Sequence, residues 1–292
     1  MKRAATLLLP VGLFAAGCSG GKAATKPEDT TLQEARYAGR EAFALERPKE
    51  AAAQYERALA RARERDDATA IGDAGYDLAV AQLAANEPKR AVDSARLTRT
   101  ELERRGAASF PALDLVEAAA LYRLDAKRDA DRIAARVEAS NDQAAAARAS
   151  FLRGLIADET GDYAELDRAL ARLSHPASPE QAADADELAA RQDLRRGQLV
   201  SAIAAAQRAA DARRSTLDYR GMARALSVAA AAAARAGDRQ TAADLYMRAG
   251  QSAAANGDVA TARPWLHQAL ALGSDPALRR AARQSLASLG GR

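Results

Sequence analysis

The sequence predicts an all-α protein, and three observations carry that prediction. Alanine, the strongest helix former, supplies roughly 80 of the 292 residues, and Leu, Arg, Glu and Gln fill most of the remainder. Valine and isoleucine are sparse, and long runs that alternate apolar and polar residues are absent. Turn-like dipeptides recur at similar intervals along the chain. Because aromatic residues make up only 4% of the sequence, we expect closely packed helices with small side chains.

The first 17 residues have the composition of a secretory signal peptide. Lys2 and Arg3 form a basic start, and residues 4–16 form an apolar stretch. A permanent transmembrane helix needs about 20 apolar residues, so this segment is too short to be one. We therefore expect residues 1–17 to be cleaved.

The segment Ala15-Ala16-Gly17-Cys18 resembles the lipobox of bacterial lipoproteins, in which small residues precede a cysteine that is lipidated and becomes N-terminal. Cys18 is the only cysteine in the chain, so it can form no intramolecular disulfide. The resemblance implies a covalent lipid on Cys18, with two or three acyl chains that anchor it stably. An ordinary secretory signal with an incidental cysteine is the alternative.

The residues after the cysteine indicate a destination and a tether. Ser19 stands where an inner-membrane retention signal has aspartate, so the resemblance implies the outer membrane, at its periplasmic face. Residues 18–30 are rich in Gly, Lys, Thr and Pro without apolar periodicity, which is typical of a flexible linker. About 12 such residues span at most about 40 Å when fully extended. The folded part is therefore expected to stand close to a membrane.

Helical hairpins are predicted from residue 31 onward. Thr31 and Glu34 form a capping-box pattern, which predicts that a helix begins there and runs to Leu45. A break at Pro48 precedes a second helix from Lys49. Its apolar stripe has helical spacing and consists of Ala51, Ala52, Tyr55, Ala58, Leu59 and Ala62. One hairpin cannot bury this stripe alone, so further hairpins must pack on it.

The hairpin recurs along the chain. Pro48-Lys49 returns as Pro88-Lys89, 88 − 48 = 40 residues later. Later turns are expected at Gly161-Asp162, Gly197-Gln198, Gly237-Asp238 and Gly257-Asp258. Repetition at this period indicates a solenoid. The prolines and serines near 174–180 predict a loop, at which an internal break could separate two blocks, and a last helix is expected from Pro276 to Leu289.

These hairpins resemble the tetratricopeptide repeat family. The clearest copies are 154–173, with Gly161-Asp162-Tyr163 at its turn, and 230–249, with Gly237-Asp238. The resemblance implies an α-α superhelical solenoid of six to seven unequal hairpins over residues 31–290. The family repeat has 34 residues, whereas the turns here are 197 − 161 = 36 and 237 − 197 = 40 apart. We therefore expect longer helices or loops in some hairpins.

Signatures of other functions are missing from the sequence. The formal charge is +4, and opposite charges are interspersed, which argues against nucleic acid as a partner. No common catalytic motif or metal-ligand spacing is present, so neither an enzyme nor a metal site nor a cofactor other than the lipid is expected. Acidic pairs such as Asp66 with Asp67 and Asp184 with Asp186 are interpreted as solvated helix ends.

In tetratricopeptide proteins the first helix of each pair lines a groove that binds other proteins. By that resemblance, the candidate partner-binding residues are Arg36, Arg40, Phe43, Phe151, Asp158, Glu187, Arg191 and Arg195. Arginine suits this role because its planar fork of donors matches carboxylates and carbonyls. The alternative for any one of them is a solvated residue or an ion pair within the solenoid.

Together these features predict a lipid-anchored periplasmic adaptor. Its partners would be other envelope proteins of pilus, secretion, transport or cell-wall machinery, bound through the groove. One alternative is a structural homo-oligomer that assembles through its own solenoid surface. The other is an enzyme or small-ligand binder with an unrecognised site.

Overall fold

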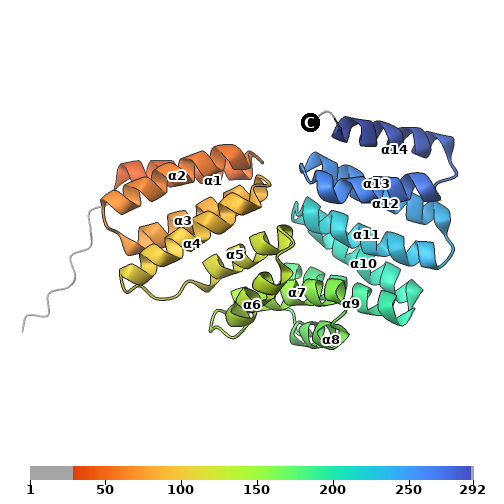
Figure 1. Ribbon diagram of the computed structural model, residues 1–292, viewed down its shortest axis with the longest axis horizontal. Helices are drawn as coiled ribbons and strands as arrows, with labels where there is room; N and C mark the ends of the chain where they lie inside the picture. Colours follow the sequence, from red (N-terminus) through yellow and green to blue (C-terminus); the bar gives the residue numbers. More distant parts are fainter. Residues whose placement is uncertain (1–28, 291–292) are drawn as a thin grey trace, which may run out of the picture.

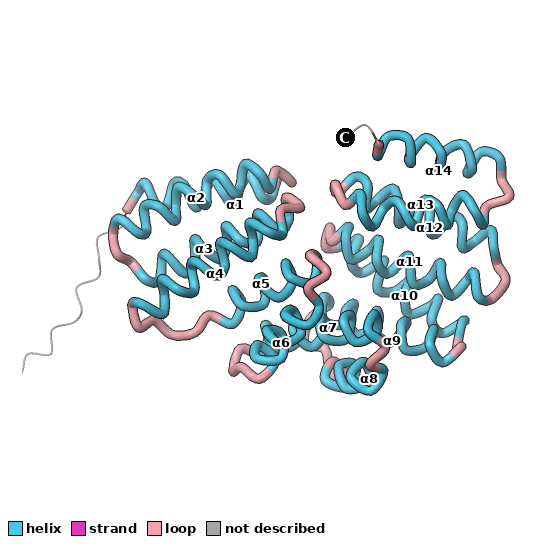
Figure 2. The backbone as a smooth tube through the Cα atoms, viewed as in Figure 1, coloured by secondary structure: helices cyan, strands magenta, loops and turns pink. Residues whose placement is uncertain are grey.

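The computed structural model describes residues 29–290, which form 14 α-helices and no strand (Figures 1 and 2). The predicted signal peptide, Cys18 and the predicted tether up to residue 28 lie outside the described residues. Within 29–290 no helix is long and apolar enough to cross a membrane. The helices are α1 Thr30–Ala44, α2 Pro48–Glu64, α3 Ala68–Ala84, α4 Pro88–Arg104, α5 Pro111–Arg123, α6 Lys127–Glu138, α7 Gln143–Thr160, α8 Tyr163–Arg172, α9 Pro179–Arg196, α10 Leu199–Ser215, α11 Tyr219–Arg235, α12 Arg239–Ala255, α13 Val259–Leu272 and α14 Pro276–Leu289.

The helices pair into seven hairpins, from α1–α2 to α13–α14, and each helix packs on the next along the chain. First helices also pack on first helices of the following hairpin, as α3 does on α5 and α7 on α9. The row follows a curved path, so α1–α4 and α10–α14 lie on opposite sides of the molecule (Figure 1). The predicted all-α solenoid of unequal hairpins is confirmed.

Three-residue turns set the repeat length. Left-handed residues lie in the connections between helices and recur every 20 positions at 46, 66, 86 and 106, and again at 197, 217, 237 and 257, and six of these eight are the middle residue of a three-residue turn. Most of the intervening helices have 17 residues, so helix and turn together make 20 and a hairpin makes 40. The shorter helices α5, α6 and α8, of 13, 12 and 10 residues, interrupt this spacing.

Leu217 offers a test of this turn geometry. Its φ is 60° and its side chain is 61% exposed, so it bears the strain of a left-handed residue with little packing in return. Replacing Leu217 with glycine is expected to raise the free energy of unfolding by about 0.5 to 1 kcal/mol, after the entropy cost of glycine. The reverse change, Gly237→Leu at the equivalent turn, should lower it by about 1 kcal/mol. Urea denaturation of both variants measures the two effects, and equal signs would contradict the prediction.

Asp29 is the first residue that the structure describes. Its carboxylate accepts a hydrogen bond from the amide of Leu32 at 2.9 Å and caps α1. The predicted capping box is therefore wrong, because Thr31 already lies inside the helix. Arg61 and Arg65 bind the same carboxylate at 2.8 and 3.0 Å. The hydrogen bond from Arg61, with that from Leu32, lowers the pKa of Asp29 to about 2.

The core is a chain of local clusters between neighbouring helices, built largely from fully buried alanines. Glycines allow the closest approaches, as at Gly154, where an added Cβ would lie 2.5 Å from Leu188 Cδ1. The loop predicted near 174–180 is present between α8 and α9. Packing continues across it, because Leu188 of α9 shares a cluster with Phe151 and Leu155 of α7.

Candidate functional site

Ion pairs and charged hydrogen bonds join the first helices of successive hairpins. Each links residues 36 or 37 positions apart, which is about one hairpin. The surface formed by α1, α3, α5, α7, α9 and α11 is therefore held by side-chain contacts as well as by apolar packing. We call it the first-helix surface. Its cross-links are Arg36–Asp73 at 3.1 Å, Arg148–Asp184 at 2.8 Å, Asp158–Arg195 at 2.9 Å and Glu187–Arg224 at 2.6 Å.

A network of charges adjoins this surface and is buried except for Arg224, whose side chain is 25% exposed. We call it the buried network, and it is made of Asp158, Asp184, Glu187, Arg191, Arg213 and Arg224. Glu187 is its centre and has no exposed surface. Its carboxylate oxygens form ion pairs with guanidinium nitrogens of Arg191 at 3.1 Å, Arg213 at 2.9 Å and Arg224 at 2.6 Å. Burial alone would raise the pKa of Glu187, but the three guanidinium groups hold it at about 2. The carboxylate is therefore charged at neutral pH.

Asp184 lies in a different environment from the one that the sequence predicts. It is fully buried between Arg148 at 2.8 Å and Arg213 at 2.9 Å, whereas we expected a solvated helix end. Burial raises the pKa of Asp184 and outweighs the attraction of these two arginines. Asp186, two residues on, does lie nearer the surface, where it pairs with Arg208 at 2.5 Å.

An aromatic ring joins the network on α7. Phe151 is buried, and three guanidinium groups lie over its ring, from Arg148 at 5.9 Å, Arg213 at 5.1 Å and Arg224 at 5.3 Å. Cations are attracted to the negative face of an aromatic ring. The ring thus helps to hold arginines that come from three different helices.

Five of the eight predicted partner-binding residues come together here. Phe151, Asp158, Glu187 and Arg191 are buried, and the charged groups of the last three are bound within the chain. Arg195 is the accessible member, with a side chain that is 45% exposed. The structure thus places four of the five beneath the surface, where they support it.

The other three predicted residues lie on α1. Arg36 is bound to Asp73 at 3.1 Å and to Asp77 at 3.6 Å on α3. Arg40 and Phe43 are exposed. The three share one face of α1 because their spacing is i, i+4, i+7. Arg40 and Phe43 are therefore exposed to solvent on the same face of α1 from which Arg36 reaches α3.

The two halves of the solenoid touch at turns that face one another in Figure 2. The side-chain amide of Asn86 donates to the carbonyl of Gly257 at 3.0 Å and accepts from Arg220 at 3.4 Å. Arg123 reaches the same region and donates to the carbonyl of Leu83. Burial, with repulsion from Arg220, lowers the pKa of Arg123 to about 10. These contacts link segments up to 171 residues apart and close the curve of the solenoid.

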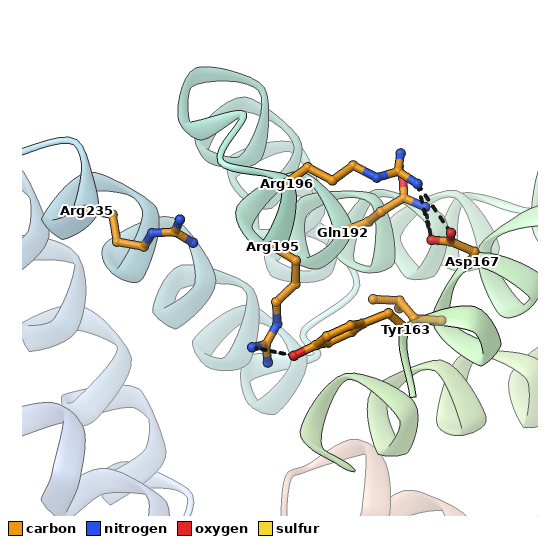
Figure 3. Close-up of a pocket in the computed structure, with 7 residues that line it drawn as sticks. Tyr163, Asp167, Gln192, Arg195, Arg196 and Arg235 are labelled. Carbon is orange, nitrogen blue, oxygen red and sulfur yellow. Dashed lines mark hydrogen bonds and ion pairs between the residues drawn. The ribbon is translucent and has the colours of Figure 1, made fainter. Parts of the chain in front are cut away.

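A pocket of about 400 Å³ lies at the ends of α9 and α11 (Figure 3). We call it the edge pocket. Three of its side chains are arginines, and one is an aspartate. The residues that line it are Tyr163, Leu166, Asp167, Gln192, Arg195, Arg196 and Arg235.

Sequence reasoning identified Arg191 but missed three other arginines that bind the carboxylates of the network, Arg148, Arg213 and Arg224. Arg213 sits in a polar stretch, and Arg148 and Arg224 sit among alanines, where an arginine reads as an exposed helix residue. A signal was nevertheless present, because Arg148 and Arg224 each lie one hairpin length from an acidic partner. Over the described residues no group of three or more His, Cys, Asp or Glu side chains is arranged to hold a metal ion.

No family model and no curated protein sequence matches this chain. A tetratricopeptide repeat protein from Parabacteroides merdae has a similar structure, with a TM-score of 0.50 and 15% identity over 90% of this chain and 100% of that one. The TPR2AB domain of yeast Sti1, in its complex with pHSP90, is matched over 90% of this chain and 99% of that one, at 16% identity and a TM-score of 0.37. With the seven hairpins described above, the first of these likenesses shows that the chain has a tetratricopeptide-like helical solenoid fold.

Proposed function

We propose that this protein is a lipid-anchored adaptor at the periplasmic face of the outer membrane, which binds segments of other envelope proteins on its first-helix surface. The observation that carries the proposal is that ion pairs cross-link the helices of this surface while several of its side chains stay exposed. Cross-links such as Glu187–Arg224 fix its helices, while Arg40, Phe43 and Arg195 remain accessible. A surface that is ordered before binding loses less entropy when a partner docks.

The membrane anchor is tested at Cys18. Replacing Cys18 with serine removes the thiol that the lipid would occupy, so the variant should move from the membrane pellet to the soluble periplasmic fraction. Cell fractionation followed by immunoblotting measures the change. Persistence of Cys18→Ser in the pellet after a high-salt wash would contradict the lipid anchor.

Partner binding is tested by photo-crosslinking in cells. A photoreactive amino acid replaces Phe43 on the first-helix surface, and a matched control replaces Leu97, which is 52% exposed on the second helix α4. Mass spectrometry should find the same foreign envelope protein reproducibly at position 43 and not at position 97. Absence of any foreign protein at position 43 would count against the adaptor.

The same experiment separates the adaptor from a homo-oligomer. The alternative is favoured by three exposed apolar side chains at the first helix of the described solenoid, which are Tyr37 and Phe43 on α1 and Leu45 at its C-cap. A second copy of the chain that packed on α1 would cover them. Crosslinks from position 43 to this protein alone would support the oligomer.

A further inference from the structure

The edge pocket gathers side chains from three helices (Figure 3). Tyr163 and Asp167 come from α8, Arg195 and Arg196 from the end of α9, and Arg235 from the end of α11. Leu166 lines the pocket but is only 1% exposed, so the half-exposed ring of Tyr163 supplies most of the apolar surface. The pocket thus combines a charged rim with an apolar wall.

Two of the three arginines are positioned by partners within the chain. Arg195 binds Asp158 at 2.9 Å, donates to the hydroxyl of Tyr163 at 3.2 Å and lies 5.2 Å from the centre of that ring. Arg196 binds Asp167 at 3.3 Å and donates to Gln192 at 3.0 Å. Each therefore has one carboxylate to balance its charge and a fixed place at the rim.

Arg235 has no such balance. Its guanidinium group donates to the carbonyl of Leu194, and within the described residues it has no carboxylate partner. Arg195 shares Asp158 with Arg191, and Arg196 is bound to Asp167, so both of these pocket arginines have a carboxylate partner, whereas Arg235 has none among the described residues. This leaves one positive charge, whose remaining N–H donors are free to bind an anion.

We propose that the edge pocket is a second binding site, which takes the carboxylate of an acidic side chain in a polypeptide segment. Guanidinium groups bind carboxylates in a planar, paired geometry, and Arg235 supplies the open fork. A doubly charged phosphate fits less well, because Asp167 lies in the same pocket and would repel it. Leu166 and the ring of Tyr163 suit the aliphatic stem of a glutamate. The site goes beyond the proposed function, because it shares only Arg195 with the accessible residues of the first-helix surface and its open donor is Arg235.

The test is an NMR titration of the full chain, labelled with ¹⁵N, with the blocked peptide acetyl-Glu-Glu-Glu-amide. Amide shifts are expected at 163–167, 192–196 and 235, and the glutamine peptide of the same length should cause none. Replacing Arg235 with glutamine should weaken binding about threefold to tenfold, as expected for one partly exposed charged contact.

Arg239→Gln is the matched control. Arg239 is also exposed, and it likewise donates to a main-chain carbonyl at the end of another helix, that of Ala271 at 3.2 Å. This variant loses the same charge outside the pocket, so its affinity for the glutamate peptide should equal that of the unchanged chain. Equal weakening by the two substitutions, or shifts spread over the whole surface, would overturn the site. Tighter binding of inorganic phosphate at the same amides would overturn its assignment to carboxylate.

Discussion

Replacing Glu187 with glutamine is expected to lower the free energy of unfolding by about 3 to 5 kcal/mol. Glutamine keeps the shape of the side chain and removes its charge. Arg191 and Arg213, whose side chains are 10% and 4% exposed, and Arg224 would then lose their shared counter-charge inside the protein. Arg191 keeps Asp158 and Arg213 keeps Asp184, but Arg224 has no other carboxylate partner among the described residues. A charge withdrawn from water without a partner cannot recover its hydration, so the loss exceeds that of a surface pair. Urea denaturation at pH 7 measures it.

Asp186→Asn on the same helix is the control for Glu187→Gln. Asp186 makes one ion pair, with Arg208, whose side chain is 61% exposed. Exposed pairs contribute little because water and salt screen them, so this variant should lose less than about 1 kcal/mol. Losses of equal size at positions 186 and 187 would show that the buried network is not the source of stability.

The effect of Glu187 should also depend on pH. Its pKa is about 2 in the folded protein against an ordinary value of 4.5, and a difference of 4.5 − 2 = 2.5 corresponds to about 3 kcal/mol. Because the folded pKa is the lower one, this stabilisation is present above pH 4.5 and is lost as the pH falls toward 2. The difference in stability between the unchanged chain and Glu187→Gln should therefore shrink over that interval. A difference that stays constant would contradict the assignment.

The fold was predictable from the sequence because its signals are local. Helix formers, apolar stripes and turns such as Gly161-Asp162 identify hairpins without reference to the rest of the chain. The 20-residue unit was harder to predict, because a glycine marks only some of its turns. Glu46 and Leu217 occupy left-handed positions that favour glycine, and nothing in their own chemistry indicates this.

The candidate site was less predictable, because burial of a charge depends on residues far away in the sequence. Asp184 looks solvated among its polar neighbours on α9, yet Arg148 from α7 and Arg213 from α10 enclose it. The edge pocket has the same origin. Arg235 is an ordinary helix-end arginine until the fold brings it beside α9, where Arg195 and Arg196 already stand. Such sites can be predicted only when the path of the solenoid is known.

Replacing either of two glycines on α3 with alanine should change the free energy of unfolding, with opposite signs at the two positions. At Gly75 an added Cβ would lie 2.2 Å from Thr98 Oγ1 and 2.8 Å from Thr98 Cβ, which is fixed to the backbone of α4. Relief of this overlap requires the two helices to separate, so Gly75→Ala should lower the free energy of unfolding by about 1 to 3 kcal/mol. At Gly72 the atom nearest to an added Cβ would be 3.5 Å away, which is an ordinary contact. Gly72→Ala should therefore raise the free energy of unfolding by up to about 1 kcal/mol, because alanine favours the helix more than glycine does.

A second substitution identifies the cause of the loss at Gly75. Thr98 is fully buried, and its hydroxyl has no hydrogen-bond partner in the described part of the chain, so Thr98→Ala removes bulk without breaking a bond. The double variant Gly75→Ala with Thr98→Ala should therefore recover most of the stability that Gly75→Ala loses. Thermal unfolding of the four chains completes the cycle. Strictly additive effects would mean that α3 and α4 are held together by contacts other than this one, and that the small residue at position 75 does not set their separation.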